Sequence, residues 1–169
     1  MKWIIFTGTW RFTNEEVERD VRQAVREVLE RGDGIITGGA LGVDWFCMDE
    51  VLKLQAQGRL KVIIPSKLEI YIEHFHMAAH IGKILPADCD RLEATLRELK
   101  SRNKAALIEM EFTSFSPSRA EYFARDQVEV DIADGLYAFH VNKSLGTQDT
   151  IDRAKVKGLP ILLHKEYIL

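Results

Sequence analysis

Short apolar runs alternate with longer amphipathic segments along this chain. The apolar runs have the length and β-branched character of buried strands, and they lie at 3–6, 34–37, 60–65, 135–141 and 160–163. Apolar residues recur at helical spacing between most of them, over 15–32, 43–57, 119–132 and 147–157. Connections of this length join parallel strands through right-handed crossovers. The pattern predicts an α/β fold, namely a Rossmann-like, open, mainly parallel sheet of five strands with helices on both faces.

The segment 66–118 fits this alternation less well. Residues 68–84 predict an irregular helix, and leucines spaced for burial predict a long helix over 88–111. With 169 residues the chain is long enough to bury one sizeable core. We therefore expect a single domain over 1–169 with a helical insertion at about 66–118.

Composition and charge narrow the class of protein. The chain is 46% hydrophobic and 29% charged, and its net charge is -3 with 23 basic and 26 acidic residues. This balance lacks the basic footprint of a nucleic-acid-binding protein, so we do not expect nucleic acid as a partner. The apolar run at 3–6 is too short for a signal peptide or membrane span. The two cysteines, Cys47 and Cys89, form no C-x-x-C motif, and we expect a reduced, cytoplasmic protein with no membrane partner.

Three turns rich in Gly, Thr and Ser follow predicted strands, at 7–11, 38–44 and 142–147. Ligands of open parallel sheets bind beyond the carboxyl ends of the strands. The first N–H groups of a helix have no internal partner, so a helix that follows such a turn favours an anion. Each turn alone is equally consistent with a tight strand-to-helix connection. The three together predict a crevice for phosphate or another anion.

The order of four motifs resembles the SLOG superfamily of Rossmann-like domains. That superfamily includes DNA-processing protein A and the "lonely guy" phosphoribohydrolases. The motifs are Phe6-Thr7-Gly8-Thr9-Trp10-Arg11, Thr37-Gly38-Gly39-Ala40-Leu41-Gly42-Val43-Asp44, Arg125-Asp126 before Ala133–Phe139, and Gly146-Thr147 with the residues up to Ile161. The match covers both ends of the chain well and residues 66–118 poorly.

The resemblance implies a Rossmann-like nucleotide-binding domain. Its ligand would be a nucleotide or nucleotide-derived phosphate compound, bound at the carboxyl ends of the strands in a sensor or carrier role and without a cofactor. The implied ligand-binding residues are Gly8, Thr9, Arg11, Gly38, Gly39, Gly42, Asp44, Arg125, Gly146 and Thr147. A homo-oligomer is left open, because many SLOG proteins are homodimers.

Catalysis is a weaker implication of the same resemblance. The phosphoribohydrolases carry Pro-Gly-Gly-x-Gly-Thr-x-x-Glu, whereas this chain keeps Gly146 and Thr147, lacks the Pro-Gly-Gly and has Thr150 at the Glu position. Weak acid/base candidates are Asp149, Asp126 and Glu121. A phosphoribohydrolase or N-glycosidase acting on a nucleoside monophosphate is therefore the alternative function. A single-stranded nucleic-acid accessory protein is the second alternative.

Several side chains have a structural and a functional interpretation. We favour Asp44 as a brace of its turn over a ribose contact, since a carboxylate suits a first helical turn. Adjacent helical residues point in different directions, so we do not expect Arg125 and Asp126 to pair.

The remaining candidates are histidines and aromatic residues. His76 and His80 have zinc-ligand spacing, but no third ligand follows, so we predict no metal site there and a helix over the crevice instead, His74 included. The aromatic residues Phe112, Phe115, Tyr122 and Phe123 favour core or interface positions, although one of them could stack on a base.

Overall fold

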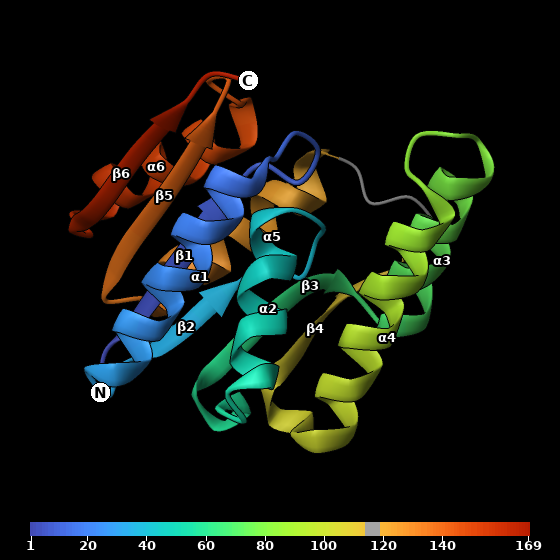
Figure 1. Ribbon diagram of the computed structural model, residues 1–169, viewed down its shortest axis with the longest axis horizontal. Coiled ribbons are helices and arrows are strands. Elements are labelled where there is room, and N and C mark those ends of the chain that lie inside the picture. Colours follow the sequence, from blue (N-terminus) through green and yellow to red (C-terminus); the bar gives the residue numbers. More distant parts are fainter. Residues whose placement is uncertain (114–118) are drawn as a thin grey trace.

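A parallel sheet of six strands forms the centre of the computed structural model, which describes residues 1–113 and 119–169 (Figure 1). The strands are β1 (Trp3–Gly8), β2 (Gly34–Thr37), β3 (Leu60–Ser66), β4 (Leu107–Phe112), β5 (Gly135–Val141) and β6 (Ile161–Tyr167). Their order is β4-β3-β2-β1-β5-β6, and every neighbouring pair is parallel. The chain therefore adds strands on one side of β1 as far as β4 and then continues on the other side. Strand order reverses between β1 and β5.

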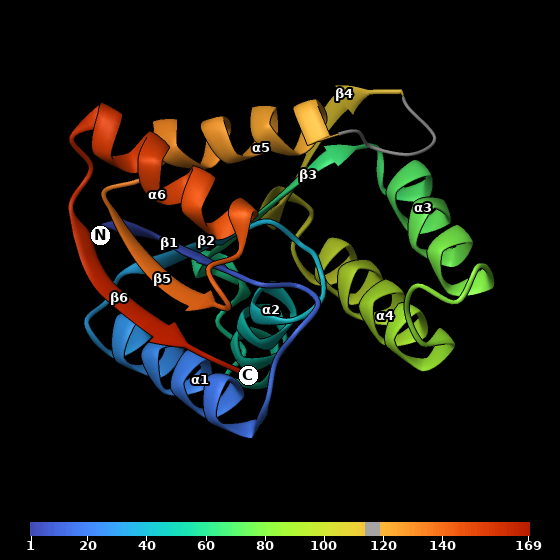
Figure 2. The ribbon, with the colours of Figure 1, turned by 90° about the horizontal axis from the view of Figure 1, so that it is seen from above.

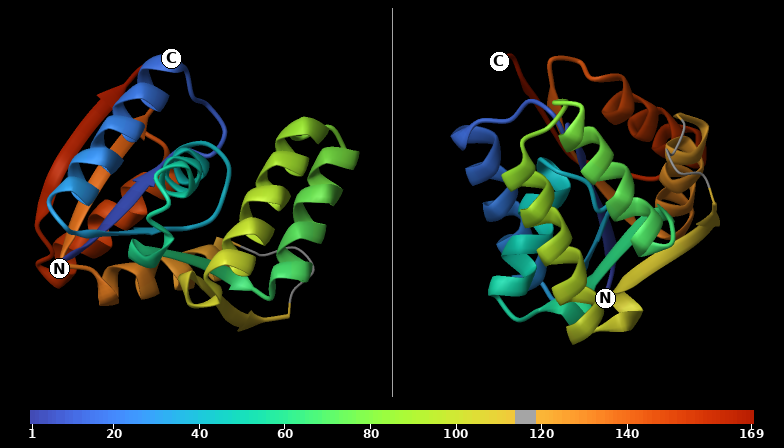
Figure 3. Two further views of the ribbon diagram at one scale, coloured as in Figure 1. Left: turned by 60° about the horizontal axis from the view of Figure 1, so that its bottom comes forward. Right: turned by 90° about the vertical axis from the view of Figure 1, so that its right-hand side faces the viewer.

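Helices cover both faces of this sheet. They are α1 (Glu15–Glu30), α2 (Val43–Lys53), α3 (Leu68–His80), α4 (Pro86–Arg102), α5 (Arg119–Ile132) and α6 (Leu145–Lys157), with short 3-10 turns at Gln57–Arg59 and Lys104–Ala106. Figure 2 shows α5 and α6 on one side of the sheet and α1 and α2 on the other. The helices α3 and α4 lie side by side near β3 and β4 (Figure 3).

The prediction of five strands is wrong by one, because the sheet has β4 as an additional edge strand. We expected residues 88–111 to form one helix, but α4 ends at Arg102 and the chain turns at Asn103. Ile108 and Met110 pack into the core, while Glu109 alternates with them. That two-residue period is typical of a strand. The leucines that precede it have helical spacing, and we extended their helix over it. The predicted insertion at 66–118 thus contributes a strand to the sheet.

The core lies on both faces of the central strands. Ile35 and Ile36 of β2 are fully buried and belong to different clusters, because successive side chains of a strand point to opposite faces. The cluster that contains Ile35 packs against α1, α2 and α4, and the cluster that contains Ile36 packs against α5 and α6. This burial explains why the central strands are almost wholly apolar. Polar residues are then concentrated where these strands end.

Among the described residues, no helix combines the length and the apolar character needed to cross a membrane.

Candidate functional site

A pocket of about 320 Å³ opens at the carboxyl end of β1, where strand order reverses. Its lining includes Thr7 and Gly8 of β1 and Gly146 and Thr150 of α6. Such a reversal point is where open parallel sheets bind their ligands. The volume is near the lower end of the range of about 300–1,000 Å³ for small-molecule sites. The topology and the cavity therefore point to the same place.

Aromatic rings form much of the pocket's apolar lining. Phe6 comes from β1, Phe75 from α3, and Tyr122 and Phe123 from α5. His74 and Ala78 of α3 also contribute, which places α3 over the crevice. Phe112 instead ends β4, and Phe115 lies outside the described residues. Two of the aromatic residues singled out in the sequence therefore lie where they can contact a ligand.

Arg125 connects the pocket to the loop after β2. Its Nη1 donates a hydrogen bond to the Gly38 carbonyl oxygen at 3.0 Å, and its Nη2 donates one to Asp126 Oδ1 at 2.7 Å. A second carboxylate is reached by Arg125 Nε, which lies 3.5 Å from Glu129 Oε1. The expectation that Arg125 and Asp126 do not pair is wrong, because the long arginine side chain bends back to its neighbour. Burial lowers the pKa of Arg125, but Glu129 and Asp126 outweigh this and raise it well above its ordinary value.

Glu129 is the most deeply buried acid of the pocket, with 2% of its surface exposed. No described group donates a hydrogen bond to its Oε1. Burial raises the pKa of Glu129 well above its ordinary value, and burial also raises the pKa of Asp126. The pocket therefore contains a carboxyl group that has hydrogen-bonding capacity to spare. The hydroxyl of Tyr71, on α3, is likewise buried without a partner among the described atoms.

Asp44 braces the turn after β2. Its Oδ1 accepts a hydrogen bond from Thr37 Oγ1 at 2.7 Å, and its Oδ2 accepts one from the Ala40 backbone N–H at 3.1 Å. Asp44 also belongs to the pocket lining. The carboxylate thus holds the glycine turn in shape at the edge of the cavity.

The ten predicted ligand residues divide into those that line the pocket and those that do not. Gly8, Asp44, Arg125 and Gly146 belong to the pocket lining. The other predicted residues lie outside this lining, and one of them, Gly42, shapes the backbone beside it. It has a φ of 67°, and a β-carbon there would meet the carbonyl oxygen of Thr9. The glycine therefore allows the loop after β1 to lie against the start of α2.

Thr9 and Thr147 use their hydroxyls within their own loops. Thr9 Oγ1 accepts from the backbone N–H of Arg11 at 3.3 Å, and Thr147 Oγ1 accepts from Ser144 Oγ at 2.8 Å. A β-carbon on Gly39 would meet Val62 and Ile64 of β3. The sequence left both roles open for each turn, because a sequence motif does not distinguish a ligand contact from the support of a turn.

A second pocket of about 260 Å³ adjoins the first, and both share Trp10 and Ile84 in their linings. Arg11, Lys83 and Arg91 contribute to the second pocket. Arg11 is therefore placed beside the main pocket and not in it. The local group of cations was missed because Lys83 and Arg91 lie in 66–118, where no motif pointed to them.

The three candidate acids lie in different environments. Asp126 belongs to the pocket lining, whereas Asp149 is paired with Arg153 at 2.6 Å on α6. Glu121 lies on α5 beside Tyr122. The sequence missed Glu129, although its position four residues after Arg125 on a helix was a usable signal.

The contacts of His76 differ from those of a metal ligand paired with His80. Its Nε2 lies 2.6 Å from Glu93 Oε2, and its Nδ1 lies 3.4 Å from Cys89 Sγ. Both ring nitrogens therefore face groups of α4. His76 joins α3 to α4.

Comparison with solved structures reveals chains of similar fold. DNA processing protein A from Helicobacter pylori has a TM-score of 0.67 at 19% identity, over 99% of this chain and 64% of that one. DNA processing protein A from Streptococcus pneumoniae has a TM-score of 0.61 at 17% identity, over 99% of this chain and 50% of that one. The structural genomics target TM1055 has a TM-score of 0.56 at 16% identity, over 95% and 72%. The protein has the same Rossmann-like α/β fold as these chains.

This chain spans 64% and 50% of the length of the two DNA processing proteins. No family model matches the sequence, and no curated protein matches it. The likeness is therefore one of fold.

One expectation about partners is overturned by this comparison. We excluded nucleic acid on net charge, but the Helicobacter pylori protein is described by its single-stranded DNA binding mode. The exclusion does not stand, because net charge sums over the whole chain and says nothing about local groups of cations.

Proposed function

We propose that the main pocket binds one nucleotide unit. The observation that carries this proposal is the pocket's lining at the β1–β5 reversal point, where aromatic rings lie beside buried hydrogen-bonding groups. Nucleobases have flat apolar faces and polar edges, so a site for them needs both kinds of group. The base and the ribose would occupy this pocket.

The face and the edge of a base would meet different residues. Tyr122 and Phe123 supply the rings on which a base can stack. The unsatisfied Oε1 of Glu129 can accept a hydrogen bond from an exocyclic amine, and a protonated Glu129 can donate one to a ring nitrogen. The ligand would thereby supply the hydrogen bond that Oε1 does not receive from the described residues.

The phosphate would lie toward the second pocket. Arg119 belongs to the lining of the main pocket. Arg11, Lys83 and Arg91 belong to that of the second, together with Asp88, which pairs with Arg91 at 2.9 Å. Arginine and lysine side chains are the usual partners of phosphate oxygens. A nucleotide lying beside Trp10, which both pockets share, would place its base and its phosphate in chemically matched surroundings.

Single-stranded DNA is a second candidate for the same surface. Two adjoining pockets can take successive nucleotides of a strand, and the cations of the second pocket suit its phosphates. Helicobacter pylori DNA processing protein A, which has a similar fold, is described by its binding of single-stranded DNA. The two candidates differ in whether the natural ligand is one nucleotide or a chain of them.

Calorimetric titration of the protein with nucleoside monophosphates and with oligodeoxythymidylate tests both candidates. We expect saturable binding of at least one ligand and a weakening of about fivefold or more in Phe123→Ala, which removes a stacking ring. Phe112→Ala is the matched control, because Phe112 ends β4 and belongs to neither pocket lining. Binding of the oligomer alone, weakening steeply with salt, would select DNA. No binding, or an equal effect of both variants, would contradict the proposal.

The same ligands can reveal hydrolysis. Asp126 is the candidate acid in the pocket, but Arg125 already holds its carboxylate. We therefore expect bound nucleoside monophosphates to remain intact. Release of free base that is lost in Asp126→Asn would make the protein a phosphoribohydrolase instead.

A further inference from the structure

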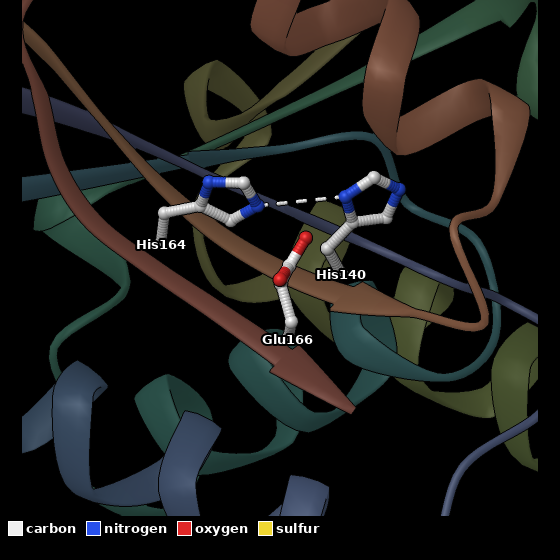
Figure 4. A group of neighbouring side chains, drawn as sticks. All are labelled: His140, His164 and Glu166. Carbon is white, nitrogen blue, oxygen red and sulfur yellow. Dashed lines mark hydrogen bonds between the residues drawn. The ribbon is translucent and has the colours of Figure 1, made fainter. Parts of the chain in front are cut away.

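Two histidines and a glutamate gather at the edge of the sheet that carries β6. His140 belongs to β5, and His164 and Glu166 belong to β6. Each offers one ligand atom, and these atoms lie within 4.8 Å of one another. Figure 4 shows the two rings facing each other with the Glu166 carboxylate beside them. The lining of the main pocket consists of other residues.

Strand register places all three side chains on one face. His140 is paired with Glu166, and Ala138 is paired with His164. His164 and Glu166 are two residues apart on one strand, so they point to the same side. Ala138 belongs to the cluster that packs against α5 and α6, which identifies that side of the sheet. The fold therefore fixes the three positions through backbone pairing.

The contacts of His140 determine which nitrogen can bind an ion. Its Nε2 lies 3.1 Å from the carbonyl oxygen of Ser144. A carbonyl oxygen only accepts, so Nε2 carries the proton and a neutral His140 has a free lone pair on Nδ1. Metal-ligating histidines characteristically donate their other N–H to a carbonyl or carboxylate in this way. His140 is thus oriented as a ligand.

The separation of the two histidines fits a tetrahedral ion. His140 Nδ1 lies 3.4 Å from His164 Nε2. With Zn–N bonds of about 2.0–2.1 Å and a tetrahedral angle, two ligating nitrogens lie about 3.3–3.4 Å apart. Adjacent octahedral ligands with bonds of about 2.1 Å would lie about 3.0 Å apart. A direct hydrogen bond between two rings would ordinarily join the nitrogens across about 2.9–3.0 Å, which is shorter than the observed distance.

We propose that His140 Nδ1, His164 Nε2 and the Glu166 carboxylate bind a zinc ion. A water molecule would complete the tetrahedron, as at three-ligand zinc sites. Glu166 is exposed, so its side chain is free to turn toward the ion. The ion would tie the edge strand β6 to β5 and raise the stability of the folded state. His76, singled out in the sequence for its spacing from His80, contacts Glu93 and Cys89 instead.

Titration of the metal-free protein with Zn²⁺, followed by calorimetry and thermal unfolding, tests the site. We expect one ion per chain and a higher unfolding temperature with Zn²⁺, since an ion that binds the native state stabilises it. His164→Gln and Glu166→Gln change exposed residues and should each weaken binding about tenfold or more. His80→Gln is the control, because His80 lies on α3 outside the cluster.

Co²⁺ provides a second readout that does not depend on stability. A Co²⁺ ion at this site should give the intense visible absorption of a tetrahedral complex, and His164→Gln should abolish it. Absence of Zn²⁺ binding, or binding that His164→Gln leaves unchanged, would overturn the proposal. The two imidazoles would then form a hydrogen-bonded pair and nothing more.

Discussion

Arg125 donates a hydrogen bond to the carbonyl oxygen of Gly38, across 3.0 Å, and so ties α5 to the loop after β2. The two residues are 87 positions apart in the sequence. The same guanidinium reaches the carboxylates of Asp126 and Glu129. The Arg125 side chain therefore connects α5 to the loop after β2 and places its positive charge beside two buried carboxyl groups.

Replacement of Arg125 by methionine should destabilise the protein strongly. The variant leaves Asp126 and Glu129 buried without their cation, and breaking a buried ion pair from one side typically costs about 3–5 kcal/mol. Chemical denaturation measures this loss. Arg125→Lys keeps the charge but cannot reproduce the planar fork, so it should fall between methionine and the native residue.

A second substitution can show whether the stability lost in Arg125→Met comes from the missing charge or from the missing packing. Addition of Glu129→Gln to Arg125→Met removes one of the buried acids and should recover part of the lost stability. A triple variant with Asp126→Asn should recover more. If neither addition helps, the role assigned to the cation is wrong.

Gly38→Ala should destabilise the protein, although alanine is normally a mild substitution. A β-carbon at this position would overlap the Arg125 guanidinium, which would have to give up its contacts. Overpacking of this kind costs about 1–3 kcal/mol. Gly146→Ala is the matched control, because among the described residues no atom beyond its chain neighbours and its own helix backbone lies within 4 Å of the added β-carbon. Denaturant midpoints that fall equally for the two variants would contradict the explanation.

Much of the fold could be predicted because its main signals are local. The apolar run at Ile35 and Ile36 predicts a buried parallel strand, and the glycine turn after it predicts a strand-to-helix junction. We did not predict β4, because Leu107 and Met110 also fit the helical spacing of the preceding leucines. Edge strands carry fewer apolar residues, so the sequence distinguishes them poorly from an amphipathic helix.

The sequence could indicate where a pocket lies in the fold, but not the contacts between the residues around it. The turns containing Gly8, Asp44 and Gly146 follow strands, and parallel strands bring such turns to one edge of the sheet. The pairing of Arg125 with Gly38 depends on tertiary packing, which spacing along the chain does not reveal. For the same reason the histidines of β5 and β6 did not draw attention. Their proximity depends on register between strands.

Asp44→Ala should loosen the glycine turn and lower stability. The carboxylate accepts from the Thr37 hydroxyl and the Ala40 N–H, and Thr37 is fully buried. Loss of an ionised acceptor that leaves buried donors unpaired costs about 2–3 kcal/mol. Thr37→Val removes the hydroxyl as well, so the double variant should cost less than the sum of the single ones. Strict additivity in urea unfolding would show that the two groups do not interact.

The contact between α1 and β6 should make stability depend on pH. Tyr167 and Lys165 donate hydrogen bonds to Asp20 Oδ2 at 2.8 and 3.1 Å. Burial alone would raise the pKa of Asp20, but these two donors and the positive charge of Lys165 lower it below its ordinary value. A lowered pKa in the folded state stabilises the protein above the unfolded value of about 3.9, and this contribution is lost as the pH falls through the folded pKa.

Asp20→Asn isolates that contribution, because an amide does not titrate. The native protein should be more stable than this variant at neutral pH, and the gap should shrink as the pH falls below about 4. Tyr167→Phe removes a donor without removing a charge, so it should weaken the same pH dependence without abolishing it. Urea unfolding at a series of pH values between about 2.5 and 7 measures all three proteins across the titration of the carboxyl group. A gap that stays constant over this range would mean that Asp20 is not held ionised by its contacts with β6.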